Sequence, residues 1–222
     1  MQLIYTGRQV ELTQQGKDLV SHPTGLTHHP DYGTFLGDTV AGKGVIYHID
    51  WQRLWADGNL NHAVLHVVHD DAAINGTRPE FVTYQGKVCI ATSDYGDKDN
   101  AVRLYDPVKL KTARRTTEPG VMVQSMPCGA FVQSLLWDEH DQLLVLVQKY
   151  DPGLGWRLTG LKLEGPELKG QSPLRLFAPF DDFSPADELE GFHLLPGTGR
   201  NLGVFLTSHK QSNVWLGSVK LP

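Results

Sequence analysis

Four polar residues occupy one equivalent position in four related segments of the chain, each two residues ahead of an apolar strand residue. They are Thr24, Glu80, Gln133 and Glu190. If the four segments meet around one axis, their side chains form a polar ring that contains two carboxylates. Carboxylates that share a space of low dielectric constant raise one another's pKa, as a general acid or base near neutral pH requires. Hard divalent cations such as Ca²⁺ prefer carboxylate oxygens, so Glu80 and Glu190 are candidate metal ligands.

A second set of side chains is expected beside this ring, because antiparallel pairing returns the end of each second strand to the start of the first strand. The set comprises Asp38, Ser93, Gln148 and Ser208, followed by Thr39, Asp94, Lys149 and His209. We take Asp94 and His209 as candidates for proton transfer. The candidate ligand-binding residues are Thr24, Glu80, Gln133, Glu190, Asp38, Ser93, Gln148, Ser208 and Lys149. The alternative is a water-filled polar lining in which Glu80 pairs with Arg78 or Lys149.

The elements that must position these residues form four repeats with one internal order. The repeat cores span residues 22–50, 78–110, 131–164 and 189–221. Each core reads as a short apolar strand, a turn rich in Asp, Gly, Pro or His, a strongly apolar strand, a polar loop and an alternating strand. Repeats of this length are typical of β-propeller blades, and further strand-like stretches at 63–68, 120–123 and 174–178 suit the outermost strand of a blade.

The sequence therefore predicts an all-β fold, a single domain over residues 1–222 in the form of a small β-propeller. Four blades match the four repeats, and five blades are the alternative count. Residues 1–20, with strand character at 3–5 and 10–12, are expected to complete the last blade and close the ring, since closure removes exposed strand edges. Helix is expected only as single turns at 50–56 and 185–189.

Composition limits the classes of partner. The formal net charge is −5, and no cluster of Lys and Arg provides the cationic surface that nucleic acid or anionic lipid requires. No apolar run approaches the ~20 residues of a membrane-spanning helix. We therefore expect a soluble protein without nucleic-acid or membrane partners.

The two cysteines indicate no disulfide framework. No signal peptide is visible at the start, which favours the cytoplasm if the chain is complete; a secreted or periplasmic location stays open if a signal has been removed.

Two segments carry a resemblance to a known family. His22-Pro23-Thr24-Gly25-Leu26 and Glu190-Gly191-Phe192 resemble the innermost-strand openings of the gluconolactonase and strictosidine-synthase-like propellers. In that family, a glutamate at this position helps to hold a divalent cation in the central channel. The resemblance implies that Glu190 and Glu80 are metal ligands, and that the channel mouth polarises a carbonyl group for hydrolysis.

Three functions are compatible with these patterns, and whether the chain is an enzyme stays open. The first is a propeller that binds a small ligand or a divalent cation at the mouth of its axial channel. The second is a metal-dependent hydrolase of lactone or ester type. The third is a protein-interaction scaffold whose loops present aromatic side chains to a partner. The tryptophans available for that role are Trp51, Trp55, Trp137, Trp156 and Trp215.

Overall fold

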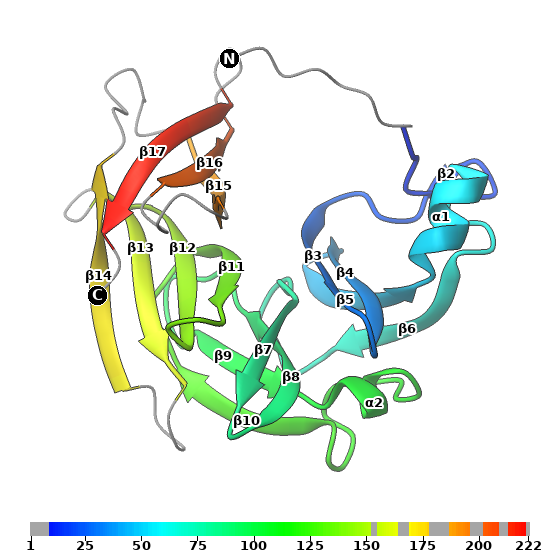
Figure 1. Cartoon of the computed structure of the whole chain (residues 1–222). Helices are drawn as coiled ribbons and strands as arrows, with labels where there is room; N and C mark the ends of the chain where they lie inside the picture. Colours follow the sequence, from blue (N-terminus) through cyan, green and yellow to red (C-terminus); the bar gives the residue numbers. More distant parts are fainter. Residues whose placement is uncertain are drawn as a thin grey trace.

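The computed structural model describes residues 9–151, 155–163, 169–177, 187–195, 202–208 and 213–220. The fold is all-β, with 55% of residues in strands and 7% in helices (Figure 1). Within the described residues, no helix has both the length and the apolar character that crossing a membrane requires.

Each predicted repeat core forms a run of antiparallel strands. The first sheet contains β3 (Pro23–His29), β4 (Gly33–Val40), β5 (Lys43–Ile49) and β6 (Val64–Asp70), paired in that order. The second contains β7 (Glu80–Tyr84), β8 (Lys87–Ser93), β9 (Ala101–Tyr105) and β10 (Met122–Pro127). The third repeat forms β11 (Val132–Asp138), β12 (Leu143–Asp151), β13 (Gly155–Lys162) and β14 (Lys169–Phe177), and the fourth forms β15 (Leu189–Leu194), β16 (Leu202–Thr207) and β17 (Val214–Lys220).

Local sequence explains the tight turns between strands. Ala41 and Gly42 join β4 to β5, and Gln85 and Gly86 join β7 to β8. All four have positive φ, between 50° and 76°. Two consecutive residues in this conformation make the hairpin turn whose twist matches that of the flanking strands, and glycine adopts it without strain at the second position.

Three apolar clusters pack neighbouring repeats against one another, and the pairing of β14 with β17 joins the third and fourth repeats into one seven-stranded sheet. One cluster joins the first sheet to the second, another joins the second to the strands of the third repeat, and a third joins the third repeat to the fourth. The three clusters contain, in this order, Phe35 and Ile90, Val82 and Leu144, and Val145 and Phe205. The first strands contact one another in the middle of the molecule: β7 touches β3 and β11, and β11 also touches β3 and β15.

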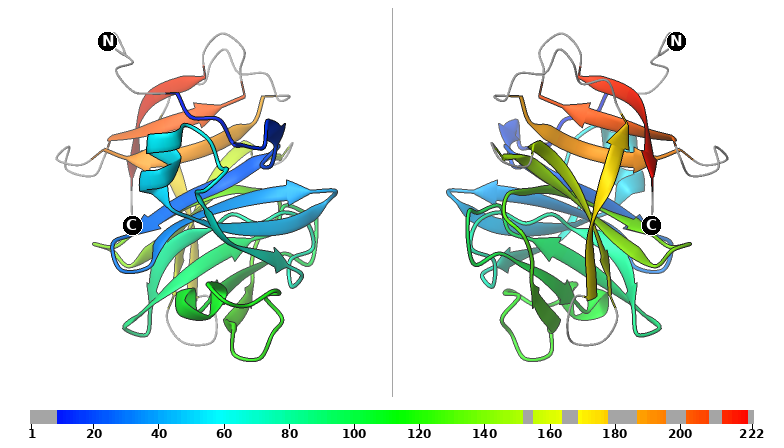
Figure 2. Two further views of the ribbon diagram at one scale, coloured as in Figure 1. Left: turned by 90° about the vertical axis from the view of Figure 1, so that its right-hand side faces the viewer. Right: turned by 90° about the vertical axis from the view of Figure 1, so that its left-hand side faces the viewer.

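The remaining face of the first sheet is covered in a different way. It packs against α1 (Trp51–Asp57) and the segment that runs from residue 10 to residue 20, which includes β1 (Thr13–Gln14) and β2 (Lys17–Asp18). Leu54 of α1 is fully buried there. Figure 2 shows α1 lying against the outside of this sheet. A second short helix, α2 (Pro107–Leu110), follows β9.

Val10 and Leu12 pack against the first sheet, and closure of the ring by residues 1–20 stays a prediction. Leu3–Tyr5 lie outside the described residues. The second expected helical turn, at 185–189, is not helical in its described part, since Asp187 forms a bend and Leu189 begins β15.

The connection between the first two sheets crosses β4 very closely. A Cβ atom at Gly37 would lie 2.5 Å from Pro79 Cδ and 2.7 Å from the carbonyl oxygen of Thr77. Both atoms belong to a segment held in place by the Thr24 hydroxyl, which donates a hydrogen bond to the Thr77 carbonyl. Only glycine fits at this position without moving the segment that leads into β7.

We therefore expect Gly37→Ala to lower the free energy of unfolding by about 2 kcal/mol or more, the cost of forcing a methyl group into a packed interior. Urea unfolding measures the change. Gly191→Ala is the matched control, because its nearest contact is a flexible side-chain atom, Leu206 Cδ1 at 3.3 Å. Equal stability losses in the two variants would contradict the close crossing.

Candidate functional site

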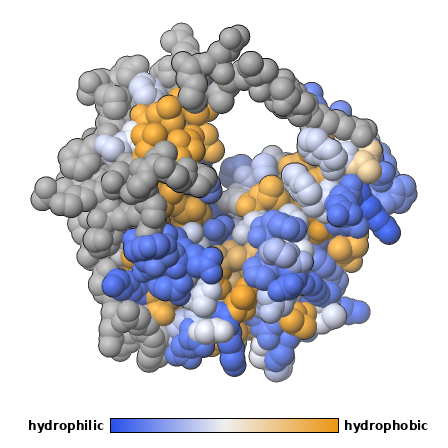
Figure 3. All heavy atoms as spheres, in the orientation of Figure 1, coloured by the Kyte–Doolittle hydropathy of each residue, from blue (hydrophilic) through white to orange (hydrophobic). Residues whose placement is uncertain are grey.

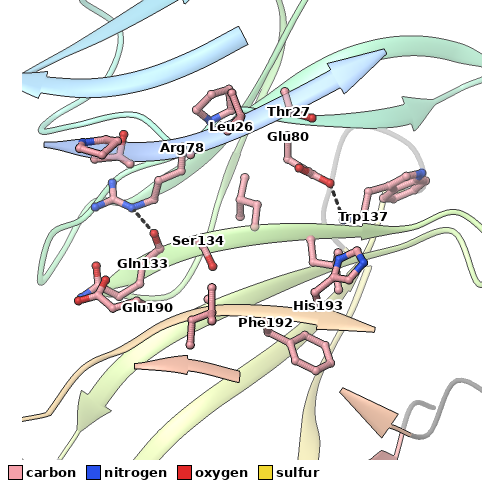
Figure 4. A pocket seen from close by; sticks show the side chains of 18 of the residues that line it. Leu26, Thr27, Arg78, Glu80, Gln133, Ser134, Trp137, Glu190, Phe192 and His193 are labelled. Carbon is pink, nitrogen blue, oxygen red and sulfur yellow. Dashed lines mark hydrogen bonds between the residues drawn. The ribbon is translucent and has the colours of Figure 1, made fainter. Parts of the chain in front are cut away.

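The first strands of all four repeats line one cavity of about 630 Å³ (Figure 4). Its wall contains Thr24, Glu80, Gln133 and Glu190, so the structure brings the whole predicted ring together. A volume of this size suits an organic ligand of drug-like dimensions. The wall also contains apolar side chains that are open to the cavity, with Leu26 52% and Leu206 47% exposed. The cavity is therefore amphipathic rather than purely polar.

Backbone irregularity explains why the polar ring residues reach the cavity. The strand register shifts between Pro23 and Gly25 in β3, between Val132 and Ser134 in β11, and between Leu189 and Gly191 in β15. The residue inside each shift is the extra residue of a β-bulge, and these three residues are Thr24, Gln133 and Glu190. Bulges redirect a side chain out of the regular alternation and recur beside functional sites. Glu80 instead occupies a regular position, opposite Ala91.

Glu80, on β7, interacts with the first strands of two other repeats, β11 and β3. Its Oε1 accepts a hydrogen bond from the backbone N–H of Trp137 on β11, at 3.2 Å. Removal from water raises the pKa of this carboxyl from 4.5 to about 7, although the Trp137 N–H and the Thr27 hydroxyl act in the opposite direction. The sequence predicted a raised pKa from a second nearby carboxylate, whereas the cause in the structure is burial. Near neutral pH, Glu80 can therefore accept or donate a hydrogen bond.

Arg78 is a charged residue of the cavity wall that the sequence-based reasoning missed as a ligand-binding candidate. It was considered only as an ion-pair partner of Glu80, yet Glu80 forms no ion pair with it. The Arg78 side chain is 4% exposed, and its Nε donates a hydrogen bond to the carbonyl oxygen of Gln133 at 2.9 Å. The signal was available in the sequence, because Arg78 precedes Glu80 by two residues and alternation places both on one side of an extended segment.

The second predicted set serves mainly to hold the backbone. Asp38 accepts a hydrogen bond from the N–H of His22 at 2.9 Å, and the Ser208 hydroxyl accepts one from the N–H of Glu188 at 2.7 Å. In the third repeat, Gln148 Nε2 donates to the carbonyl oxygen of Ala130 at 2.7 Å. In each case, the end of the second strand is tied to the segment that enters the first strand. None of these three side chains lies in the cavity wall.

Asp94 has the same role in the second repeat, where its Oδ1 accepts a hydrogen bond from the N–H of Ile74 at 2.7 Å. Its Oδ2 lies 2.8 Å from Arg103 Nη1 and also accepts from the N–H of Ala101. Because both oxygens are occupied and the side chain is fully buried, the geometry favours a structural role over proton transfer. Ser93 is also buried, with its hydroxyl 3.5 Å from Cys128 Sγ.

The other predicted site residues can be placed only in part. His209 and the side chain of Lys149 lie outside the described part of the chain. Within that part, no three His, Cys, Asp or Glu side chains come close enough together to hold a metal ion.

Trp137 packs against the core and lines the cavity, and Trp215 packs against the apolar cluster between the third and fourth repeats. Trp51 and Trp55 are exposed on α1, with ring centroids 6.4 Å apart. The side chain of Trp156 lies outside the described residues.

A comparison with models of known protein families and with curated proteins finds no match to this sequence. The geometry of the cavity is therefore the basis on which a function can be proposed.

The raised pKa of Glu80 predicts a specific dependence of stability on pH. The folded protein binds the Glu80 proton more tightly than the unfolded chain does, so the wild type should lose stability as the pH rises from about 4.5 to about 7. Glu80→Gln removes this titration while keeping an oxygen for the Trp137 N–H. Relative to the wild type, the variant should gain about 2 kcal/mol in its free energy of unfolding across that window. Urea unfolding at several pH values measures the difference, with Glu139→Gln, at an exposed turn, as the control. A constant difference between Glu80→Gln and the wild type would show that Glu80 has no raised pKa.

The structural role of Asp94 can be tested in the same way. Asp94→Asn leaves Arg103 buried without its counterion and should cost about 3 kcal/mol or more. Asp97→Asn, in the exposed part of the same loop, should change the free energy of unfolding by less than about 0.5 kcal/mol. If Asp94→Asn is as stable as Asp97→Asn, the buried ion pair does not hold this loop.

Proposed function

We propose that this protein is a small β-propeller with four blades that binds a small organic ligand in its axial cavity. The observation that carries the proposal is the convergence of the four first strands on one cavity whose wall combines Thr24, Glu80, Gln133 and Glu190 with exposed leucines. Sites for small molecules are concave, largely preformed and lined by apolar side chains with a few placed polar groups.

The arrangement of the strands supports the propeller. The four repeats form consecutive antiparallel runs, their first strands contact one another, and neighbouring repeats pack through apolar clusters. In this arrangement, the cavity occupies the position of the axial channel, and the apolar surface over β16 and β17 borders it (Figure 3). Leu206 belongs both to that surface and to the cavity wall.

Binding of a divalent cation, metal-dependent hydrolysis and a scaffold role remain hypotheses. The cavity brings Glu80 and Glu190 into one wall, but the described residues add no third ligand of the kind that Ca²⁺ or Zn²⁺ requires. Glu80 is also only about half ionised at neutral pH, which weakens it as a ligand for a hard cation. We therefore place binding of an organic molecule first.

Filling the cavity tests this function. Ser134 lines the middle of the wall, and Ser134→Trp should occupy the space that a ligand needs. The wild type should bind members of a library of several hundred soluble fragments with dissociation constants in the micromolar to millimolar range, detected by saturation-transfer NMR, and these fragments should compete with one another. Ser134→Trp should lose this binding while keeping its circular dichroism spectrum.

Lys162→Trp is the matched control, because it adds the same aromatic ring at an exposed position on β13. This variant should bind the fragments as the wild type does. The proposal fails if no fragment binds the wild type, or if Ser134→Trp binds the same fragments with unchanged affinity.

A further inference from the structure

The cavity contains a buried cation that has no counterion among the described residues. The Arg78 side chain is 4% exposed, and no carboxylate in the described part of the chain lies within 4.0 Å of its guanidinium. Buried arginine is uncommon unless it is paired, because removing a charge from water is costly. An unpaired guanidinium in the wall of a cavity therefore calls for an explanation.

The nearby groups do not neutralise this charge. Arg78 donates from Nε to the Gln133 carbonyl at 2.9 Å and makes a longer contact, 3.5 Å, from Nη1 to the Ser93 carbonyl. Both acceptors are neutral, and the Tyr95 ring lies 5.3 Å from Arg78 Cζ. Of the acidic groups that face Arg78, Asp94 is already paired with Arg103, and Glu190 lies beyond ion-pair distance. The second terminal nitrogen, Nη2, donates to no described residue.

The guanidinium remains charged under physiological conditions. Burial lowers the pKa of Arg78 to about 10, while Tyr95, Asp94 and Glu190 act in the opposite direction. The group is still protonated at neutral pH, so the cavity holds a fixed positive charge at the end where Gln133 and Glu190 lie (Figure 4). A planar guanidinium offers parallel N–H donors that match the two oxygens of a carboxylate.

Apolar side chains share the cavity wall with Arg78. Leu26 and Leu206 are 52% and 47% exposed, and Leu135 and Phe192 line the same space. Apolar side chains of this size gain free energy when a ligand covers them. The cavity thus combines one cationic end with an apolar body, which is the complement of an organic acid.

We propose that the ligand of the axial cavity is an organic acid, whose carboxylate binds the guanidinium of Arg78 and whose apolar part lies on Leu26 and Leu206. This inference rests on the proposed function, because it names the class of molecule that the cavity takes. The ligand supplies the counterion that the described residues do not provide. Glu80, on the other side of Figure 4, lies where a hydroxyl or amino group of the ligand can form a hydrogen bond.

Pairs of molecules that differ only in charge test the proposal on the wild-type protein. Four carboxylic acids with apolar bodies of increasing size, starting with 3-phenylpropionate, are each compared with their primary amides by isothermal titration at pH 7.5. The acid and the amide have nearly the same shape. Each acid that binds should do so at least about tenfold more tightly than its amide, as a charge-assisted hydrogen bond to a buried guanidinium requires.

Variants of Arg78 then locate the source of the preference. Arg78→Met keeps the length of the side chain without the charge and should abolish the preference for the acid. Arg78→Lys should keep part of it, because the charge remains without the paired donors. Lys98→Met, at an exposed loop position, is the matched control and should leave the preference unchanged. If Arg78→Met does not fold, the comparison of acids with amides on the wild type still decides the question.

The outcomes separate this inference from the proposed function. If acids and amides bind the wild type equally well and Ser134→Trp blocks both, the cavity binds organic molecules and the role of Arg78 is wrong. If the acids bind more tightly and Arg78→Met keeps that preference, another group holds the carboxylate and the inference is also overturned. If no member of the panel binds and the fragment library is silent as well, the proposed function itself fails.

Discussion

The cavity depends on how the chain enters the first strand of each repeat. In three repeats, an extra residue interrupts the pairing at this point, and the resulting bulge turns Thr24, Gln133 or Glu190 toward the centre. A bulge leaves backbone groups without their regular partners. Side chains at the end of the second strand bind the backbone of the segments that lead into these bulges, as Asp38 does at the His22 N–H and Gln148 at the Ala130 carbonyl. Asp38 and Gln148 therefore help to shape the cavity although they do not line it.

The second repeat also directs polar side chains into the cavity, but it does so without a β-bulge. It enters β7 through Arg78 and Pro79 and pairs regularly from Glu80 onward. The Arg78 side chain donates to the backbone of β11, while Glu80 accepts from it, so these two residues link the second sheet to the third repeat. Both groups are held away from water, and both lie in the cavity wall. The proposed ligand would therefore meet two polar groups whose charged forms are costly to bury.

Sequence reasoning predicted the repeats and the polar ring because both follow from local patterns. Apolar second strands such as Leu143–Val147, bounded by turns, identify the central strand of a sheet, and the ring residues keep one fixed distance from an apolar neighbour. The structural role of Asp94 could not be predicted, since its partner Arg103 approaches only after β8 and β9 have paired. The pairing of β14 with β17 was also missed, because it joins two repeats whose separate patterns carry no information about each other. The spacing of Arg78 from Glu80 indicated a shared side of the chain, but the sequence does not reveal that the Arg78 charge is buried.

A crystal structure of the protein soaked with a fragment that binds the wild type would decide whether the four first strands form a binding site. We expect density for the fragment between β3, β7, β11 and β15, in contact with the guanidinium of Arg78 and with at least two of Thr24, Glu80, Gln133 and Glu190. A fragment bound at another surface, or a structure in which those four side chains do not share one cavity, would contradict it.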